Sequence, residues 1–349
     1  MRLHYSAITL QLSETFTIAH DQRSEQEALI VGLQWRDHLG IGQSTASKYY
    51  QVSLSDMITS LEQARASLEE IGSSPLPEPE DFWQSMYPLF AENPFALSAL
   101  DMAYHDLFAK VLGKPLYELW GLTPLQAPLS NYTIGMGSST EMADKMKATP
   151  WPLYKIKLGT SEDLHIIQAL REITDVPFRV DANCAWKAQT TKELAPKLKA
   201  LGVEFIEQPL KANDWTGMKT IYPNSPLPYL ADESCKTEED VEKCHGYFHG
   251  INIKLPKCGG LTPARRMIKK ARELQMKVMV GCMTESIVGI SAICQLAPLL
   301  DYVDVDGAML VSNDIAQGVQ ISQGKIHYTN LPGTGAALTP AFQAKLLAS

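Results

Sequence analysis

Short apolar runs that each end in a charged residue recur along the middle of the chain. They are Tyr154 to Lys157, Phe178 to Asp181, Val203 to Glu207, Tyr229 to Asp232 and Gly250 to Lys254. Stretches with a helical hydrophobic period separate them, so the runs follow one another at the spacing of a βα unit. A charged residue at the end of consecutive parallel strands is typical of a barrel enzyme, which builds its site there. The pattern therefore predicts an α/β barrel.

This alternation of strands and helices predicts eight barrel strands. They are Ser130 to Ile134, Tyr154 to Leu158, four strands that end at Asp181, Glu207, Asp232 and Lys254, then Lys277 to Cys282 and Tyr302 to Asp306. No long helix is expected after the eighth strand, so the predicted fold class is α/β, a modified TIM barrel of the (β/α)7β type. In an eight-stranded barrel the second and sixth strands are diametrically opposite. We therefore expect Lys157 and Lys254 to face each other across the mouth.

The region before the barrel has a different pattern, strands followed by helices. Two strands are expected at Leu3 to Leu12 and Ala28 to Arg36, a turn at Asp37 to Gly40, and helices at Ser53 to Glu70 and Pro94 to Leu112. We predict an α+β domain over residues 1–125, the barrel over 126–320, and a C-terminal segment, 321–349, that returns to the first domain.

Composition and charge exclude several classes of function. The net charge of −8, with no concentrated basic face, argues against a nucleic-acid partner. No long apolar segment predicts a signal peptide or a membrane span, so we expect a cytoplasmic protein. The six cysteines include no C-x-x-C pair, which argues against a zinc ribbon.

Two lysines, Lys155 and Lys157, lie on one face of the second barrel strand because side chains alternate along a strand. Two neighbouring cations in a partly buried place favour the neutral form of one of them. One lysine could then act as a base near neutral pH. The alternative is an edge strand with two lysines in water.

Three carboxylates, Asp181, Glu207 and Asp232, end three consecutive strands at the same relative position. Converging carboxylates repel one another, and a hard divalent cation with oxygen ligands relieves that repulsion. We expect Mg²⁺ at this place. The alternative is three unrelated surface acids.

Five short motifs together resemble the enolase superfamily and, within it, the muconate-lactonizing-enzyme subgroup. The motifs are Lys155-Ile156-Lys157, Val180-Asp181-Ala182-Asn183, Ile206-Glu207-Gln208-Pro209, Ala231-Asp232-Glu233-Ser234 and Asn252-Ile253-Lys254-Leu255. The resemblance covers essentially the whole chain and implies that the first domain caps the barrel. It also implies that the three carboxylates bind Mg²⁺, that Lys157 and Lys254 are acid/base catalysts, and that Lys155 tunes Lys157.

Such a site can move a proton next to a carboxylate. Mg²⁺ on the carboxylate stabilises the enediolate that forms when the proton leaves, and a lysine takes the proton. With one lysine on each face, a proton can leave one side and return on the other, a 1,1-proton transfer that inverts the stereocentre. The seventh strand, Lys277 to Cys282, lacks the histidine of the mandelate-racemase subgroup, which disfavours that subgroup.

An acidic pair on the eighth strand indicates the substrate. Asp304 and Asp306 share a face and resemble the Asp-x-Asp motif with which dipeptide epimerases hold an ammonium group. The resemblance implies epimerisation of Ala-X dipeptides of the L-Ala-D/L-Glu type. It further implies that Thr133, Cys282, Met283 and Thr284 line the pocket, and that Asp21 or Arg23, in a polar loop at residues 20–25, contacts the side chain of X.

Other functions stay open at this stage. A cycloisomerase or an o-succinylbenzoate synthase would use the same lysines and metal but would not need Asp304 and Asp306. A Schiff-base aldolase could use Lys254 as its nucleophile. A non-catalytic ligand-binding barrel is the alternative outside the enzymes. The family's frequent oligomers imply a possible homo-oligomer.

Overall fold

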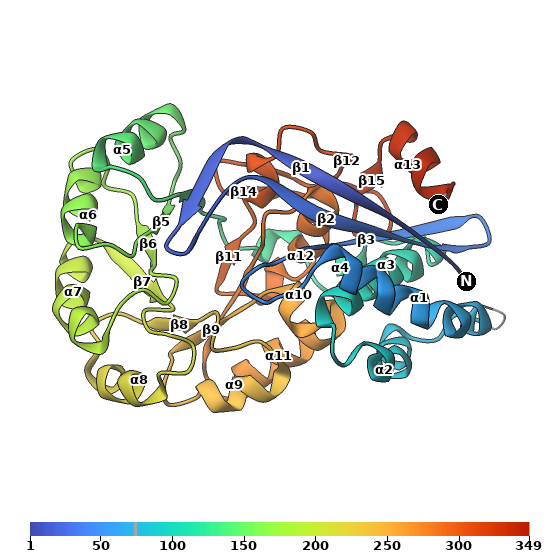
Figure 1. Ribbon diagram of the computed structural model, residues 1–349, viewed down its shortest axis with the longest axis horizontal. Coiled ribbons are helices and arrows are strands. Elements are labelled where there is room, and N and C mark those ends of the chain that lie inside the picture. The colour runs from blue at the N-terminus through green and yellow to red at the C-terminus, as the bar shows by residue number, and fades with distance from the viewer. Residues whose placement is uncertain (73–74, 349) are drawn as a thin grey trace.

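Two sheets organise the chain, whose computed structural model describes residues 1–72 and 75–348. The first is an antiparallel sheet of β1 (Arg2–Ile18), β2 (Asp21–Trp35) and β3 (His38–Thr45). The second has eight parallel strands in the order β4 to β11, and a bridge between Ser130 and Val303 joins its two edges into a barrel. In Figure 1 the β1–β2 hairpin crosses in front of the barrel.

The barrel alternates strands and helices. Its strands are β4 (Tyr132–Ile134), β5 (Tyr154–Lys157), β6 (Phe178–Asp181), β7 (Val203–Glu207), β8 (Tyr229–Ala231), β9 (Gly250–Ile253), β10 (Lys277–Gly281) and β11 (Tyr302–Asp304). The helices that follow them are α5 (Ser139–Ala148), α6 (Asp163–Arg171), α7 (Ala188–Ala200), α8 (Trp215–Ile221), α9 (Glu238–Cys244), α10 (Leu255–Cys258), α11 (Leu261–Glu273) and α12 (Ile287–Cys294). Only a short 3-10 turn, η4 (Gly307–Leu310), follows β11 directly. The predicted (β/α)7β barrel is therefore confirmed.

Helices cover the first sheet on one side. They are α1 (Leu54–Ile71), α2 (Pro79–Phe90), α3 (Pro94–Val111) and the short α4 (Leu116–Leu119). Ser53 and Asp56 form a capping box at the start of α1, which satisfies two of the backbone N–H groups exposed there. The expected helices at residues 53–70 and 94–112 are α1 and α3, whereas α2 was not predicted.

The turn that was predicted at Asp37 to Gly40 is shorter and lies at Arg36 and Asp37, and strand β3 begins at His38, so the last three residues of that prediction were wrong. Gly40 and Gly42 bring this strand against the backbone of α3, where a Cβ atom on either glycine would lie 2.1 Å from a carbonyl oxygen. Only glycine permits such a close approach. The packing that selects glycine here removes the apolar alternation from which a strand is predicted.

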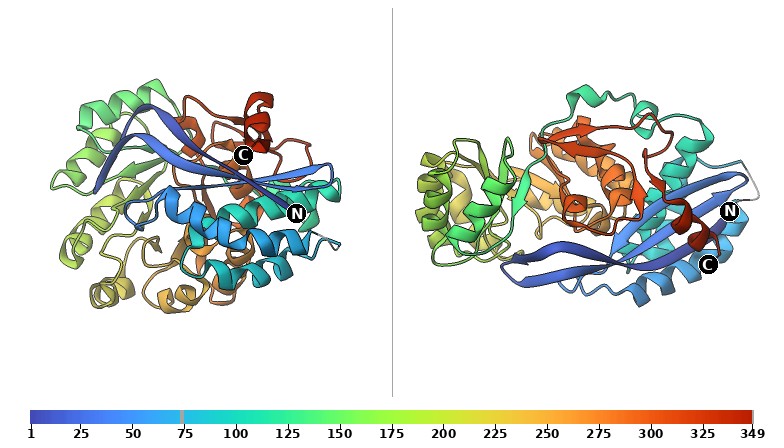
Figure 2. Two further views of the ribbon diagram at one scale, coloured as in Figure 1. Left: turned by 45° about the vertical axis from the view of Figure 1, so that its right-hand side comes forward. Right: turned by 90° about the horizontal axis from the view of Figure 1, so that it is seen from above.

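The β1–β2 hairpin is longer than the strands expected at residues 3–12 and 28–36. Its strands pair as far as Ile18 and Asp21, so the polar loop predicted at 20–25 is mostly the start of β2. Much of the distal part of β1 is exposed, and its residues therefore lack the apolar alternation of a half-buried strand. Figure 2 shows the hairpin reaching from the first sheet toward the barrel.

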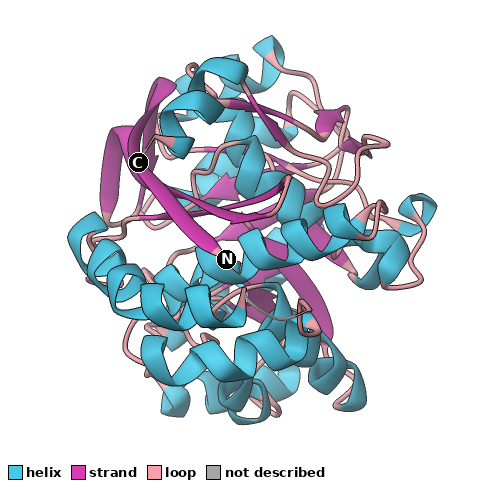
Figure 3. Cartoon of the chain, turned by 90° about the vertical axis from the view of Figure 1, so that its right-hand side faces the viewer, coloured by secondary structure: helices cyan, strands magenta, loops and turns pink. Residues whose placement is uncertain are grey.

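Short strands and a final helix complete the described chain. They are β12 (Ala316–Gln317), β13 (Gln320–Ser322), β14 (Lys325–His327), β15 (Ala337–Leu338) and α13 (Pro340–Leu347). Phe342 and Leu346 of α13 are buried together with Ile30 and Ile41 of the first sheet, and Figure 3 shows the chain ends near each other. The C-terminal segment therefore packs on the first sheet. The domain boundaries at residues 125 and 320 stay predictions.

A buried carboxylate joins the first domain to the barrel. Asp101 of α3 accepts hydrogen bonds from the backbone N–H (2.9 Å) and the hydroxyl (2.8 Å) of Thr262 at the start of α11. The indole N–H of Trp83 also donates to the carbonyl of Gly259, at 3.0 Å. These contacts hold the first domain over one side of the barrel. In the ranges that the structure describes, no helix is long and apolar enough to cross a membrane.

Candidate active site

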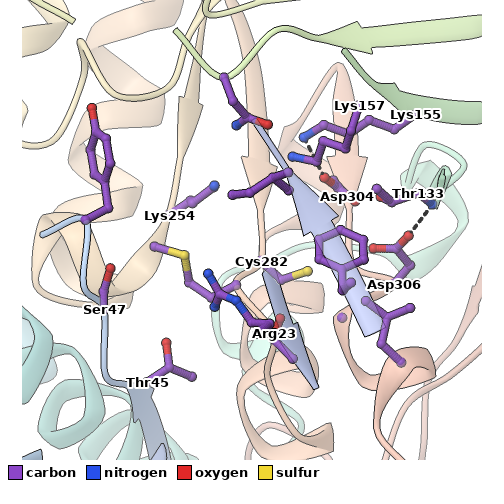
Figure 4. Close-up of a pocket in the computed structure, with 18 of the residues that line it drawn as sticks. Arg23, Thr45, Ser47, Thr133, Lys155, Lys157, Lys254, Cys282, Asp304 and Asp306 are labelled. Atoms are coloured by element: carbon purple, nitrogen blue, oxygen red, sulfur yellow. Dashed lines mark hydrogen bonds and ion pairs between the residues drawn. The ribbon is translucent and has the colours of Figure 1, made fainter. Parts of the chain in front are cut away.

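A cavity opens at the carboxyl ends of the barrel strands, under the tip of the β1–β2 hairpin (Figure 4). Its barrel side includes Lys157 and Lys254, and the first domain contributes Phe16 and Ile18 of the hairpin and Tyr49 after β3. The cavity therefore needs both parts of the chain. The hairpin forms part of the cavity wall through Phe16 and Ile18.

Lys157 and Lys254 point into this cavity from opposite sides (Figure 4). The Nζ atom of Lys157 lies 2.7 Å from Oδ2 of Asp181, and that of Lys254 lies 2.7 Å from Oδ2 of Asp232. Burial lowers the pKa of Lys254, but the carboxylates of Asp232, Glu207 and Glu233 together outweigh it, so the pKa is above its usual value. A carbon atom held between the two ammonium groups would face one lysine on each side.

The carboxylates of Asp181, Glu207 and Asp232 lie fully buried at the ends of β6, β7 and β8. Burial and the charge of Asp181 raise the pKa of Glu207 to about 7. Among the described residues, Oε2 of Glu207 and Oδ2 of Asp232 accept no hydrogen bond, although lysine nitrogens lie 2.8 and 2.7 Å away. Buried carboxylate oxygens that repel one another suit a hard cation. The donor set therefore fits Mg²⁺.

Lys155 occupies a different environment from the one expected. Its Nζ atom lies 3.1 Å from Asp181, 2.8 Å from Glu207 and 2.9 Å from Asp304. Burial lowers the pKa of Lys155, but the three carboxylates more than offset this, and the pKa is raised well above its usual value. Lys155 is therefore not the neutral member of the pair, because carboxylates surround it; that Lys157 acts as the base stays a prediction.

The acidic pair forms another wall of the cavity. Asp304 ends β11 and accepts a hydrogen bond from the side chain of Asn131 (2.7 Å), while Asp306 accepts one from the backbone N–H of Thr133. Burial and the neighbouring Asp304 raise the pKa of Asp306 to about 8. Figure 4 shows both carboxylates beside Cys282. Two buried carboxylates at this wall can receive a cationic group.

The segment after β10 lines the cavity with Cys282, Met283 and Thr284. The carboxyl of Glu285 folds back to accept the N–H of Met283 at 2.8 Å. Ser286 donates its N–H at 3.2 Å, and its hydroxyl as well, to the buried side chain of Gln43 in β3. A strand of the first domain thus holds this cavity segment in place.

Asp21 and Arg23, the two hairpin residues predicted to contact the side chain of X, differ in position. Arg23 lines the cavity, opposite Phe16 in the strand register, whereas Asp21 is not among the described lining residues. The guanidinium of Arg23 pairs with Asp21 and also donates to Gln26. Much of its charge is therefore compensated within the hairpin.

Sequence reasoning gave no role to three residues that position the site. Asn252 donates to Glu207 at 2.7 Å, and Lys257 lies 2.6 Å from Asp232 and also donates to backbone carbonyl groups. Asn131 holds Asp304. Asn252 and Asn131 precede Lys254 and Thr133 by two residues, so alternation would have placed them on the inner face. Lys257 follows in a helical turn, where strand periodicity gives no signal.

Two family models match the chain. The first, described as "Mandelate racemase / muconate lactonizing enzyme, N-terminal domain", matches residues 7–121, and the second, "Enolase C-terminal domain-like", matches residues 139–342. The chain belongs to the enolase superfamily, in its mandelate racemase and muconate lactonizing enzyme branch. The motifs at the ends of its barrel strands are thus those of a superfamily member, as predicted.

Several relatives cover nearly the whole chain. An "L-Ala-D/L-amino acid epimerase" of Flavobacterium johnsoniae is 49% identical over 97% of this chain and 100% of its own length. An "L-Ala-D/L-Glu epimerase" of Bacteroides thetaiotaomicron is 36% identical over 96% and 87%. Among superfamily structures, a dipeptide epimerase of Cytophaga hutchinsonii, solved with Mg and the dipeptide D-Ala-L-Val, is 25% identical over 99% and 97%, with a TM-score of 0.91.

Proposed function

We propose that this chain is a Mg²⁺-dependent epimerase of Ala-X dipeptides. The observation that carries the proposal is the pair Asp304 and Asp306, two buried carboxylates on the wall of a cavity that also holds the two opposed lysines. A dipeptide has one ammonium group, which the acidic pair would bind, and one carboxylate, which would bind the Mg²⁺ held by Asp181, Glu207 and Asp232. The relatives named as epimerases of alanine dipeptides agree with this assignment.

The chain's own groups account for inversion at the α-carbon of X. Lys157 and Lys254 approach from opposite sides, so one removes the α-proton and the other delivers a proton to the opposite face. Asp181, Glu207 and Asp232 would hold Mg²⁺, whose positive charge would stabilise the negative charge that develops on the substrate carboxylate. Each lysine must leave its carboxylate partner, because both are ion paired in the structure.

We further propose that X is preferentially uncharged. Arg23 is the hairpin cation that lines the cavity, and Asp21 compensates its charge. An acidic side chain of X would therefore gain little from Arg23, and Asp21 stands nearby to repel it. Phe16 and Ile18 add apolar surface at the same end. The relative with the broader name, for D/L amino acids rather than for Glu, is also the more similar of the two reported above.

Proton NMR in D₂O tests the activity and the identity of X together. Small pools of Ala-X dipeptides, with X acidic, neutral or basic, are incubated with the protein and Mg²⁺. We expect the α-proton signal of neutral X to disappear while the diastereomer appears, and a chelator to stop both changes. If only dipeptides with an acidic X exchanged their α-proton, the proposed preference for uncharged X would be contradicted. Absence of exchange in every pool, with Mg²⁺ still bound, would contradict the function.

The same experiment separates the alternatives. A cycloisomerase or an o-succinylbenzoate synthase would convert a carboxylate that has no ammonium group, and a non-catalytic barrel would bind dipeptides without exchange. A Schiff-base aldolase would act without metal and would be trapped by borohydride through Lys254. A cytoplasmic location and assembly into a homo-oligomer stay predictions from the sequence.

A further inference from the structure

Three side chains with metal-binding atoms converge on one wall of the cavity: Cys282 from the end of β10, and Asp304 and Asp306 from the end of β11. We propose that they form a second metal site, which binds a thiophilic divalent cation such as Zn²⁺ and thereby blocks the wall that receives the substrate's ammonium group. The competition with substrate rests on the proposed function. The metal site itself does not.

The geometry suits a small cation. One donor atom from each of the three side chains lies within 4.8 Å of the other two. Tetrahedral Zn²⁺ with bonds of roughly 2.2 Å would place its ligand atoms roughly 3.5 Å apart. Shifts of the ligand atoms by about 1 Å, through side-chain rotation, would therefore complete the site. The fourth position would hold a water molecule, because the cavity reaches this wall. Three protein ligands and one water are a common zinc arrangement.

The charges at this wall also favour a cation. Asp306 is only 3% exposed, and it forms no ion pair within the described part of the chain. Its contacts are the backbone N–H of Thr133 and the neighbouring Asp304, whose charge raises the pKa of Asp306. A divalent cation between the two carboxylates would remove this repulsion.

One nearby cation opposes binding and limits its strength. Lys155 lies 2.9 Å from Oδ2 of Asp304, while Asn131 donates to Oδ1 at 2.7 Å. A carboxylate oxygen has two lone pairs, so Asp304 can keep these partners and still accept a metal. A substrate ammonium group meets the same opposing charge. A divalent cation is repelled by Lys155 more strongly than a singly charged ammonium group, but the two carboxylates also attract it more strongly.

The chemistry of the ligands distinguishes this site from the Mg²⁺ site. Mg²⁺ prefers oxygen ligands in octahedral geometry, which Asp181, Glu207 and Asp232 offer, whereas a thiolate selects zinc. Binding at Cys282 would displace the thiol proton to solvent and form a sulfur–metal bond. No electron transfer is needed. Mg²⁺ and Zn²⁺ would then occupy separate places on the same molecule.

Cobalt provides a direct probe, because Co²⁺ replaces Zn²⁺ and gives a sulfur-to-metal absorption band only when a thiolate binds it. We expect this band when Co²⁺ is added to the Mg²⁺-saturated protein, and we expect Cys282→Ser to remove it. Cys184→Ser is the matched control, since Cys184 is a half-buried free thiol that shares a hydrogen bond of 3.9 Å with the Tyr49 hydroxyl and is not part of this cluster. That variant should keep the band.

Inhibition supplies the second measurement. With saturating Mg²⁺, Zn²⁺ should compete with an Ala-X dipeptide, and Cys282→Ser should weaken the inhibition constant at least tenfold relative to that variant's own KM. A band that survives Cys282→Ser, or one that is lost in Cys184→Ser, would overturn the proposal. So would inhibition that excess Mg²⁺ relieves and excess dipeptide does not. If no dipeptide is a substrate, the cobalt band still tests the metal site alone.

Discussion

The Nζ atom of Lys155 lies 2.9 Å from Oδ2 of Asp304, and the same atom lies within 3.1 Å of Asp181 and Glu207. One buried ammonium group therefore joins the predicted metal ligands to the acidic pair. Its carboxylate partners end three different strands, β6, β7 and β11. Lys155 thus compensates charge at both ends of the site, while its predicted tuning of Lys157 stays a prediction.

Replacing Lys155 with methionine should destabilise the protein when no metal is bound. The change keeps the side-chain volume but leaves carboxylates buried without their cation, which typically costs about 3–5 kcal/mol. Mg²⁺ brings positive charge to Asp181 and Glu207, so saturating Mg²⁺ should restore part of the lost stability. Chemical denaturation of Lys155→Met, with chelator and with Mg²⁺, measures both effects.

Lys145→Met is the control for this measurement. Lys145 pairs with Glu14 on the surface, and such exposed pairs contribute about 0–1 kcal/mol. An equal loss of stability in Lys155→Met with and without Mg²⁺ would show that the metal does not share the carboxylates of Lys155.

Removing either opposed lysine should separate proton exchange from inversion. Lys157→Ala and Lys254→Ala should each lower epimerisation by about 10²–10⁴-fold, the usual contribution of a positioned acid or base. Each variant keeps one lysine, so it should still exchange the α-proton of one diastereomer with D₂O. Because the lysines lie on opposite sides, the retained diastereomer should differ between the two variants. NMR of each pure diastereomer in D₂O measures this.

Lys243→Ala is a suitable control, because Lys243 lies outside the cavity lining and pairs with Asp240 on the surface. It should epimerise at nearly the parental rate. If both lysine variants kept exchange of the same diastereomer, the assignment of one lysine to each face would fail.

The acidic pair should be needed only for substrates with an ammonium group. Asp306→Asn keeps an oxygen that can accept the Thr133 N–H but removes the charge. A hydrogen bond to a charged group contributes about 1.5–3 kcal/mol, so kcat/KM for Ala-X should fall by about 10–100-fold. N-acetylated Ala-X, which has no ammonium group, should react poorly and almost equally with the parent and the variant. A parent that prefers the acetylated substrate would contradict the role of the pair.

The barrel and the positions of its site residues followed from the sequence because they depend on local patterns. Alternation placed Lys155 and Lys157 on one face, and the strand count placed Lys157 opposite Lys254, as the structure has them. Their electrostatic environment depends on contacts between distant segments. Lys155 and Asp304 are 149 residues apart, and no local pattern indicates that they pair. The raised pKa of Lys155 was therefore not predicted, although its position was.

The first domain was harder to predict, for a different reason. Gly40 and Gly42 replace apolar residues where β3 touches α3, and the distal hairpin has too little buried surface for a strand pattern. The hairpin tip and the residues after β3 nevertheless complete the cavity. The segments of the first domain that line the cavity are thus the ones in which apolar periodicity is weakest.

A buried glutamine of β3 should control how well the cavity binds substrate. Gln43→Ala would leave the N–H and hydroxyl of Ser286 without their acceptor, at a cost of about 1–3 kcal/mol in stability. The freed segment carries Cys282, Met283 and Thr284, so KM for Ala-X should rise more than kcat falls, while Mg²⁺ affinity stays unchanged. Steady-state kinetics and Mg²⁺ titration measure these quantities. Gln84→Ala, on the exposed face of α2, should change neither. Lost stability with an unchanged KM would mean that Gln43 only packs the interface between the domains.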